Sequence, residues 1–519
     1  MTFSLRRERG LAGPLGVLLA VAGGVAAGLA HPPFGLLPGL FGFALAALAL
    51  DRVGEVRPLR SAFLRGWAAG FGYFLVGTWW VGEAFLVDIE VHGWQAPFAV
   101  ILLPAGLGLF WGLAGAAYRA VAPPGAARRV LVFAAVWSLA EWLRGHVLTG
   151  FPWNLPGEAW RAGSAPSQAA ALFGAYGLTF VTLAVAASPV VLATGERRGA
   201  RVAPLALAAL ALAALWGGGL WRLSTPVAET PLLVRVVQPN IPQSAKLDAA
   251  AFTAIVDQHV SLTRAPAARR PDVVIWPESA IPAPADDLFA PGTWTRDAIG
   301  GSLGVGQTLL AGLFRVEDGL YYNSLIAIRR DADGVRPTAV YDKHRLVPFG
   351  EYMPLEQLAT RLGLKQLAGV GESFSAGPEP APIAPAGLPM LQPLICYESL
   401  FPGFTGTRGP RPAWIVNVSN DAWFGRTSGP WQHLNLASYR AIEEGLPLVR
   451  ATPTGVSAVI DPLGRTRARL GLGERGVIDA AVPAALSPTP YSRWRELPFW
   501  IFCAAGLACV IRRRRGLRR

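Results

Sequence analysis

Charged residues are scarce in this sequence. Asp, Glu, Lys and Arg make up 16% of its 519 residues and 52% are hydrophobic, whereas about a quarter of an ordinary soluble domain is charged. Acidic residues are the rarer sign, with 34 Asp and Glu against 47 Lys and Arg and a formal net charge of +13. The basic residues form no stripe interleaved with aromatic side chains, which argues against a nucleic-acid partner. The composition instead indicates a membrane protein with two or more structural units.

Cysteine is also rare, with three residues in the chain. Cys503 and Cys509 lie in the last apolar run, where a helix would separate them by roughly 9 Å along its axis, too far for a disulfide. Cys396 stands alone in a polar region. The sequence also lacks the ligand spacings of zinc and calcium sites, and no glycine-rich phosphate loop follows a predicted strand. No disulfide framework, metal or cofactor is therefore expected.

Long apolar runs dominate the first half of the chain. Seven precede residue 225 and one follows residue 496, and most approach the roughly 20 residues that cross a membrane. The predicted spans are 11–30, 33–50, 62–82, 96–118, 130–147, 168–194, 202–221 and 497–511.

Basic residues are unevenly divided among the connections between these runs. Five short segments hold 19 of the 47 basic residues, at 6–9, 52–65, 119–129, 197–201 and 512–519. The intervening connection 83–95 has acidic side chains but no Lys or Arg. Because positively charged loops stay in the cytoplasm, both termini are predicted to be cytoplasmic and residues 225–496 to lie outside.

The region between the last two spans has a different character. Its β-branched runs predict buried strands at 232–237, 273–275, 325–328 and 414–418, and helices are expected near 246–264, 355–363 and 431–445. The predicted organisation is a membrane domain of seven spans at 1–224, an α/β domain at 225–490, and a final span with a basic cytoplasmic tail at 491–519.

Three short motifs of the α/β region bring together a carboxylate, an amine and a thiol. Glu278 lies in Trp-Pro-Glu-Ser, Lys343 in Tyr-Asp-Lys-His and Cys396 in Ile-Cys-Tyr-Glu. Alone, each has an ordinary interpretation, as a helix-start carboxylate, a solvated lysine and a buried thiol respectively. Together they are the groups that nucleophilic acyl transfer through a thioester needs. Cys396 also follows a strand-like run, and strand ends in α/β sheets expose side chains to a cleft.

The order and context of these motifs resemble the nitrilase, or carbon–nitrogen hydrolase, superfamily. With the flanking spans, the resemblance narrows to its membrane-embedded branch, the bacterial apolipoprotein N-acyltransferases. It extends over essentially the whole chain and includes Gln-Pro-Asn-Ile-Pro-Gln at 238–243, Ser-Asn-Asp-Ala-Trp-Phe-Gly at 419–425 and the loop 150–154. One departure is Leu247, where some relatives have Trp, so any lipid contact at that position stays open. The implied fold is a multi-span α-helical membrane bundle plus a nitrilase-like αββα sandwich domain.

The resemblance implies a catalytic triad of Glu278, Lys343 and Cys396. Glu278 is expected to take the Cys396 proton and return it to the leaving group. Lys343, kept cationic by neighbouring carboxylates, is expected to lower the thiol pKa and to stabilise the tetrahedral oxyanion.

Other residues are expected to support this triad. Glu351 and Glu398 would orient Lys343 or accept the proton of an incoming amine, and a backbone N–H at the turn to Tyr397 would assist. Candidate substrate-binding residues are Trp153, Asn420, Trp423 and His433. Structural roles remain open for the last three, at a strand end or in packing. In the fifth predicted span, Glu141 and Arg144 share one helix face and are either a functional pair or a plain interfacial one.

The resemblance also implies the substrates. The acyl donor would be membrane phospholipid, and the acceptor the free α-amine of the diacylglyceryl-cysteine of an apolipoprotein. The expected location is the bacterial cytoplasmic (inner) membrane, with the catalytic domain on the outer, periplasmic face and the protein a monomer. The alternative enzyme is a membrane-tethered amidase or nitrilase, in which water attacks in place of the amine. A transporter or scaffold is disfavoured by the intact triad.

Overall fold

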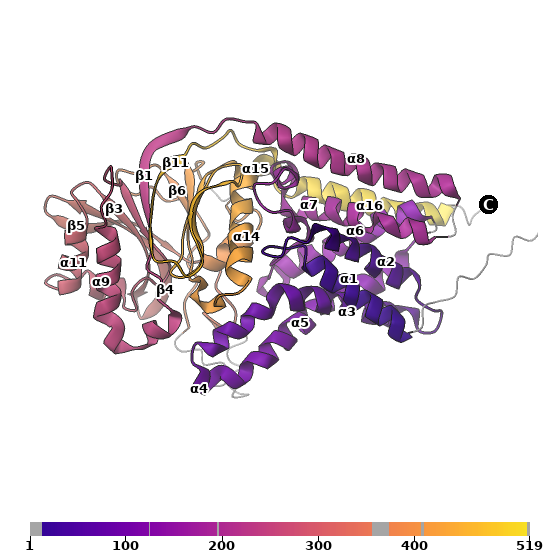
Figure 1. Ribbon diagram of the computed structural model, residues 1–519, viewed down its shortest axis with the longest axis horizontal. Helices are drawn as coiled ribbons and strands as arrows, with labels where there is room; N and C mark the ends of the chain where they lie inside the picture. Colours follow the sequence, from indigo (N-terminus) through magenta and orange to yellow (C-terminus); the bar gives the residue numbers. More distant parts are fainter. Residues whose placement is uncertain (1–12, 124, 195–196, 355–372, 406–408, 516–519) are drawn as a thin grey trace, which may run out of the picture. The chain divides into compact units, whose positions relative to one another are not determined.

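The computed structural model describes residues 13–123, 125–194, 197–354, 373–405 and 409–515 (Figure 1). The chain divides into two compact units. The helical unit comprises Met1–Gly82, Pro97–Leu223 and Trp494–Arg519, and the α/β unit comprises Glu83–Ala96 and Ser224–Arg493. The α/β unit therefore includes a short segment from the first half of the chain.

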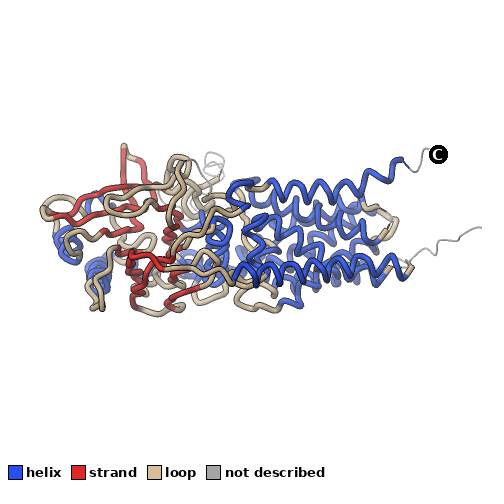
Figure 2. Tube along the Cα trace, turned by 90° about the horizontal axis from the view of Figure 1, so that it is seen from above, coloured by secondary structure: helices blue, strands red, loops and turns tan. Residues whose placement is uncertain are grey.

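Long helices that run side by side form the helical unit (Figure 2). They are α1 (Gly13–Gly28), α2 (Gly42–Asp51), α3 (Pro58–Thr78), α5 (Ala96–Val121), α6 (Ala126–His146), α7 (Ala170–Ala187), α8 (Arg198–Leu223) and α16 (Leu497–Arg515). Among the residues that the structure describes, four helical segments are long and apolar enough to cross a membrane, at Ile89–Val121, Ala126–Thr149, Pro166–Ala193 and Arg198–Leu223. Within the same residues, shorter apolar helices lie at Gly13–Gly28, Leu37–Asp51 and Leu497–Val510.

Two predicted spans differ from the observed helices. In the predicted span 33–50 the α-helix begins only at Gly42, because prolines at 32, 33 and 38 break the hydrogen-bonding pattern before it. The predicted span 62–82 corresponds to α3, whose 21 residues include Arg60 and Arg65 and do not meet the hydropathy of a span. The Arg65 side chain is buried and donates to the carbonyl of Ala49. The predicted basic segment 6–9 and the last four residues of the segment 512–519 lie outside the described residues.

A buried ion pair connects α6 to the loop that follows it. The side chains of Glu141 and Arg144 are both fully buried and form a salt bridge. The indole Nε1 of Trp111 donates to Glu141 Oε1 at 2.6 Å, and Arg144 donates to the carbonyl of Phe151. The pair is therefore buried inside the helical unit, where it anchors the 150–154 loop.

Two β-sheets build the α/β unit. In the six-stranded sheet the strand order is β11-β1-β2-β3-β4-β5, and in the five-stranded sheet it is β10-β9-β8-β7-β6. The strands are β1 (Glu229–Gln238), β2 (Val273–Trp276), β3 (Thr308–Glu317), β4 (Leu320–Asp331), β5 (Gly334–Asp342), β6 (Leu391–Ile395), β7 (Trp414–Val418), β8 (Leu448–Ala451), β9 (Ser457–Ile460), β10 (Thr466–Leu470) and β11 (Gly476–Pro483). The neighbours β1, β2 and β3 are parallel, as are β6, β7 and β8.

The two sheets share one buried apolar core. It contains Val236, Ile275 and Leu310 from the first sheet and Ile395 and Val416 from the second. On the other face of the first sheet pack α9 (Phe252–Thr263), α10 (Ala285–Leu288) and α11 (Trp294–Ser302), and on the other face of the second packs α14 (Gly429–Glu444). The predicted αββα sandwich is therefore confirmed.

The predicted elements of this unit agree well with those observed. The four predicted strands fall in β1, β2, β4 and β7, and the helix predicted near 431–445 is α14. The helix predicted at 246–264 begins later, at Phe252, because two short 3-10 turns, η8 (Gln243–Leu247) and η9 (Ala249–Ala251), precede it. The helix predicted at 355–363 lies outside the described residues.

Candidate active site

The strand directions bring Glu278 and Lys343 to the same edge of the six-stranded sheet. Glu278 follows β2 after one proline, and Lys343 directly follows β5. Because β4 is antiparallel to both β3 and β5, β5 runs in the same direction as β2. Asn323, near the start of β4, lies at this edge too, and its carbonyl accepts a hydrogen bond from the Lys343 amide at 2.8 Å.

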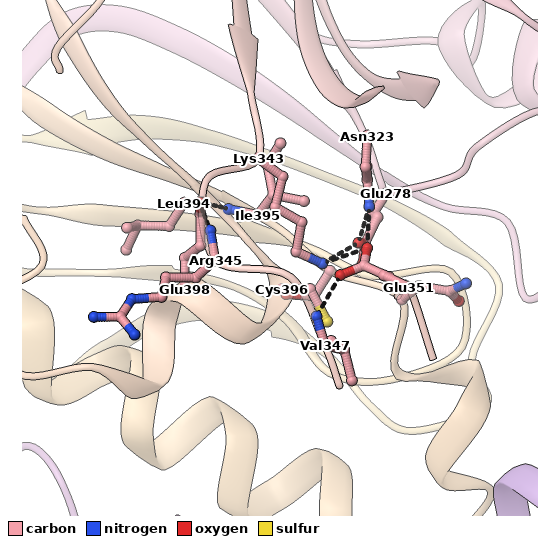
Figure 3. A network of polar contacts seen from close by, with 12 residues as sticks. Glu278, Asn323, Lys343, Arg345, Val347, Glu351, Leu394, Ile395, Cys396 and Glu398 are labelled. Carbon is pink, nitrogen blue, oxygen red and sulfur yellow. Dashed lines mark hydrogen bonds and ion pairs between the residues drawn. The ribbon is translucent and has the colours of Figure 1, made fainter. Parts of the chain in front are cut away.

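One ammonium group and one amide connect two carboxylates at this edge (Figure 3). Lys343 Nζ donates to Glu278 Oε1 at 3.1 Å and to Glu351 Oε1 at 2.8 Å. Asn323 Nδ2 donates to the same two oxygens, at 2.7 and 2.8 Å. Burial alone would lower the pKa of Lys343, but Glu278 and Glu351 outweigh it and raise that pKa above its ordinary value. Lys343 is therefore cationic, as predicted.

Cys396 comes from the other sheet, directly after β6, and begins the 3-10 turn η10 (Cys396–Leu400). Its φ of 49° lies in the left-handed region, which is strained for a residue with a side chain. Ser399 Oγ donates to the Cys396 carbonyl at 2.8 Å, and the amide of Ile395 donates to Glu398 Oε2 at 2.8 Å, so the turn is held on both sides. Figure 3 shows Cys396 in one cluster with Glu278, Lys343 and Glu351.

The surroundings of Cys396 disfavour the thiolate form of its side chain. Burial and the nearby Glu278 raise its pKa well above the ordinary value, and Lys343 and a hydrogen bond from the Asn420 backbone N–H only partly oppose them. Lys343 lowers the thiol pKa, as predicted, but burial and Glu278 outweigh it. The buried Glu278 Oε2 has no hydrogen-bond partner among the described residues. A carboxylate beside a thiol that resists ionisation suits proton transfer during attack.

The two supporting glutamates, Glu351 and Glu398, accept hydrogen bonds from different groups. Glu351 orients Lys343 directly through Oε1, while its Oε2 accepts from the Val347 amide at 2.8 Å. Glu398 makes no hydrogen bond to the Lys343 ammonium, since its Oε1 accepts from the Tyr341 hydroxyl and the amides of His344 and Arg345 at 2.9, 2.7 and 3.2 Å. It thus fixes the chain on both sides of Lys343. Burial raises the pKa of Glu398 to about 7.

A buried network lies behind Cys396. His433 Nδ1 lies 2.8 Å from Asp421 Oδ1, and His433 Nε2 lies 3.2 Å from the Cys396 carbonyl. Arg450 pairs with Asp421 at 2.8 Å, and all these side chains are buried. Burial and Arg450 lower the pKa of His433, while Arg450 and His433 outweigh burial and lower the pKa of Asp421. A neutral His433 beside an ionised Asp421 holds the cysteine turn in place.

The remaining predicted residues of the α/β unit lie around this cluster. Asn420 Nδ2 donates to Gln243 Oε1 at 2.9 Å. The Tyr397 ring is buried against Phe401, with 5.1 Å between centroids. Trp423 is 38% exposed and so is available to a ligand.

Trp153 and Leu247 are the other two positions that the sequence singled out. Trp153 belongs to the helical unit, where it is buried against Trp80 with 4.5 Å between ring centroids. Leu247 is 63% exposed. A substrate contact at Trp153 remains a prediction, and whether Leu247 contacts a lipid stays open.

Sequence reasoning missed Asn323. It stands inside a strand with no motif around it, and only the β4–β5 register, which pairs Ser324 with Asp342, places it beside Lys343. Among the residues that the structure describes, no three His, Cys, Asp or Glu side chains are grouped as a metal site would require.

The buried Glu–Lys–Cys cluster between two sheets of an αββα sandwich defines a carbon–nitrogen hydrolase type of enzyme. Residues 233–491 match the Carbon-nitrogen hydrolase family, and residues 23–188 match the Apolipoprotein N-acyltransferase N-terminal domain. The chain is 56% identical to the apolipoprotein N-acyltransferase of Caulobacter vibrioides over 95% of its own length and 93% of that protein. It is 39% identical to the protein of that name from Rhodopseudomonas palustris, over 96% and 95% of the two chains. The chain therefore belongs to the apolipoprotein N-acyltransferase family.

Among solved structures, the chain is similar to a CN-hydrolase superfamily protein from Xanthomonas campestris that has an arsenic adduct in its active site. The similarity covers 52% of this chain and 96% of the Xanthomonas chain. The sequence identity is 18% and the TM-score is 0.32.

Proposed function

We propose that the protein transfers a fatty acyl chain from a membrane phospholipid to the N-terminal amine of the diacylglyceryl-cysteine of an apolipoprotein. The observation that carries the proposal is the buried cluster of Glu278, Lys343 and Cys396, in which Glu278 Oε2 has no hydrogen-bond partner among the described residues. Membership of the family supports the choice of substrates.

In the first half-reaction, the sulfur of Cys396 attacks the ester carbonyl of the phospholipid while Glu278 Oε2 takes the thiol proton. The oxyanion of the tetrahedral intermediate is stabilised by the Lys343 ammonium. When the intermediate collapses, the C–O bond breaks and Glu278 returns the proton to the leaving lysophospholipid oxygen. The product is a thioester on Cys396.

In the second half-reaction, the α-amine of the apolipoprotein attacks the thioester. Glu278 takes a proton from the amine nitrogen, the C–S bond breaks, and the same proton restores the thiol. The net result is one amide and one lysophospholipid, with the enzyme unchanged. Glu398, with a pKa of about 7, keeps the cysteine turn fixed through both steps.

The membrane arrangement belongs to the same proposal. The helical unit, which includes α16, would cross the inner membrane eight times in a monomer, with both termini cytoplasmic and the α/β unit on the periplasmic face. The alternation of basic and non-basic connections supports this orientation. A site on that face meets both lipid substrates.

The acyl-enzyme is the species that tests the proposal. Purified protein given phospholipid alone should release about one equivalent of lysophospholipid and then stop, with Cys396 acylated in the mass spectrum. A diacylglyceryl peptide with a free N terminus should discharge the acyl group, whereas its N-acetylated form should not. Cys396→Ala should show no burst. Continuous fatty-acid release without acceptor would instead identify a hydrolase of the amidase type.

A further inference from the structure

Lysine is nearly absent from this chain. It supplies three of the 47 basic residues, and the other 44 are arginine. Lys343 is in the active site, Lys246 lies in η8, and Lys365 lies outside the described residues. A lysine presents a compact point charge where arginine presents a wide planar fork. Positions that keep lysine in such an arginine-rich chain are therefore candidates for a role that needs a small cation.

Lys246 reaches the turn that carries the catalytic base. Its side chain is buried, and its Nζ donates to the carbonyl of Ser279 at 2.7 Å. Ser279, the residue after Glu278, has a φ of 50°, a left-handed conformation that an L-residue keeps only when its surroundings enforce it.

The opposite side of the same turn packs on β3. The amide of Ala280 donates to the carbonyl of Gly312 at 2.9 Å. A Cβ at Gly312 would lie 2.5 Å from the Cα of Glu278, so the backbone of the base is in direct contact with this strand. Gly312 and Lys246 thus hold the turn from two sides.

The charge of Lys246 also acts on Glu278. Burial lowers the pKa of Lys246 to about 8, and its attraction to Glu278 opposes that decrease. Lys343 and Asn323 occupy only Oε1 of Glu278, while Oε2 has no hydrogen-bond partner in the described part of the chain. Two buried ammonium groups therefore interact electrostatically with Glu278, and its Oε2 has no hydrogen-bond partner among the described residues.

We propose that Lys246 is a positioning residue for Glu278: by holding the carbonyl of Ser279 it fixes the Glu278–Ser279 turn, so that Glu278 Oε2 stays in place to take the Cys396 proton. This rests on the proposed acylation of Cys396. In this role Lys246 acts on the first chemical step through Glu278 and does not itself contact the substrate.

The first test compares Lys246→Met, which keeps the length of the side chain, with Arg264→Met, which removes an exposed cation of the same unit. Lys246→Met should slow the phospholipid-dependent acylation of Cys396 by about 10²-fold with little change in the KM for phospholipid, as expected for a displaced catalytic group. Arg264→Met should match the wild type. An unchanged acylation rate in Lys246→Met, or an effect on KM alone, would overturn the proposal.

The second test uses pH and can be decided on the wild type alone. The ammonium of Lys246 is present below its pKa of about 8 and lost above it. Single-turnover acylation by the wild type should therefore decrease as the pH rises through that value, and folded Lys246→Met should lack this decrease. A wild-type rate that stays level from one pH unit below to one unit above would contradict the role.

A lipid-free measurement separates this proposal from the proposed function. Alkylation of Cys396 by iodoacetamide, quantified on its peptide by mass spectrometry, reports thiol activation whatever the natural substrate is. Slower alkylation in Lys246→Met supports the positioning role even if phospholipid gives no burst. Equal alkylation in wild type and variant would reject it even if the burst occurs.

Discussion

At the residue scale, the site relies on the shape of one cation. The single nitrogen of Lys343 satisfies Glu278 Oε1 and Glu351 Oε1 together, at 3.1 and 2.8 Å. A guanidinium spreads its donors over a wider plane and cannot place one charge between two oxygens in the same way. A compact ammonium can also stabilise the negative charge that develops on the substrate's carbonyl oxygen when Cys396 attacks.

Lys343→Arg should therefore lose at least about 10²-fold in the lysophospholipid burst, the usual cost of removing an oxyanion donor. Arg336→Lys is the matched control: it makes the reverse exchange, arginine to lysine, at an exposed residue that pairs with Asp331. Its lysophospholipid burst should equal that of the wild type. Near-normal turnover by Lys343→Arg would rule out the point-charge role.

Glu351→Gln should slow acylation while the protein stays folded. The change removes one of the two carboxylates that raise the pKa of Lys343, but it leaves an acceptor oxygen for Lys343 or for the Val347 amide. A decrease of about tenfold in kcat is expected, at the lower end of what a displaced catalytic group costs. Rates and thermal unfolding should be measured together, because a lowered melting temperature would indicate a structural role instead.

At the element scale, the sequence could predict whatever depends on local pattern. Runs of β-branched residues predicted β1, β2, β4 and β7, and the strand before Cys396 placed the thiol at a sheet edge. Asn323 and Lys246 could not be predicted in this way. The first reaches Lys343 through strand register, and the second reaches Ser279 across 33 residues of chain. Likewise, the net shift of the Cys396 thiol pKa depends on how deeply the residue is buried, and three short motifs do not reveal burial.

The bundle offers a prediction of its own at this scale. Arg144→Met should destabilise the helical unit by about 3–5 kcal/mol, because it leaves Glu141 buried and uncompensated. Thermal unfolding in detergent measures this effect. The double variant Glu141→Gln/Arg144→Met should recover part of the loss, since neither charge remains. A single variant as stable as the wild type would show that the pair contributes nothing to the bundle.

At the scale of the whole molecule, the chemistry makes a demand on the surroundings. A thioester must last until a second lipid-linked substrate arrives, so water has to be kept from Cys396. The buried position of the thiol, 8% exposed, is consistent with that demand. Both proposed substrates are anchored in a bilayer, which gives a physical reason for joining a nitrilase-like sandwich to a set of apolar helices.

The orientation of the chain can be measured directly. Basic residues at 52–65, 119–129 and 197–201 alternate with connections that have few, and the end of α16 adds four consecutive arginines from Arg512. Since such segments remain in the cytoplasm, a reporter fused after Arg519 should be cytoplasmic and one inserted near residue 290 should be periplasmic. Alkaline phosphatase, active only outside, and green fluorescent protein, fluorescent only inside, give opposite readouts at each position. Both positions on one side of the membrane would exclude an odd number of crossings between them and with it the eight-span topology.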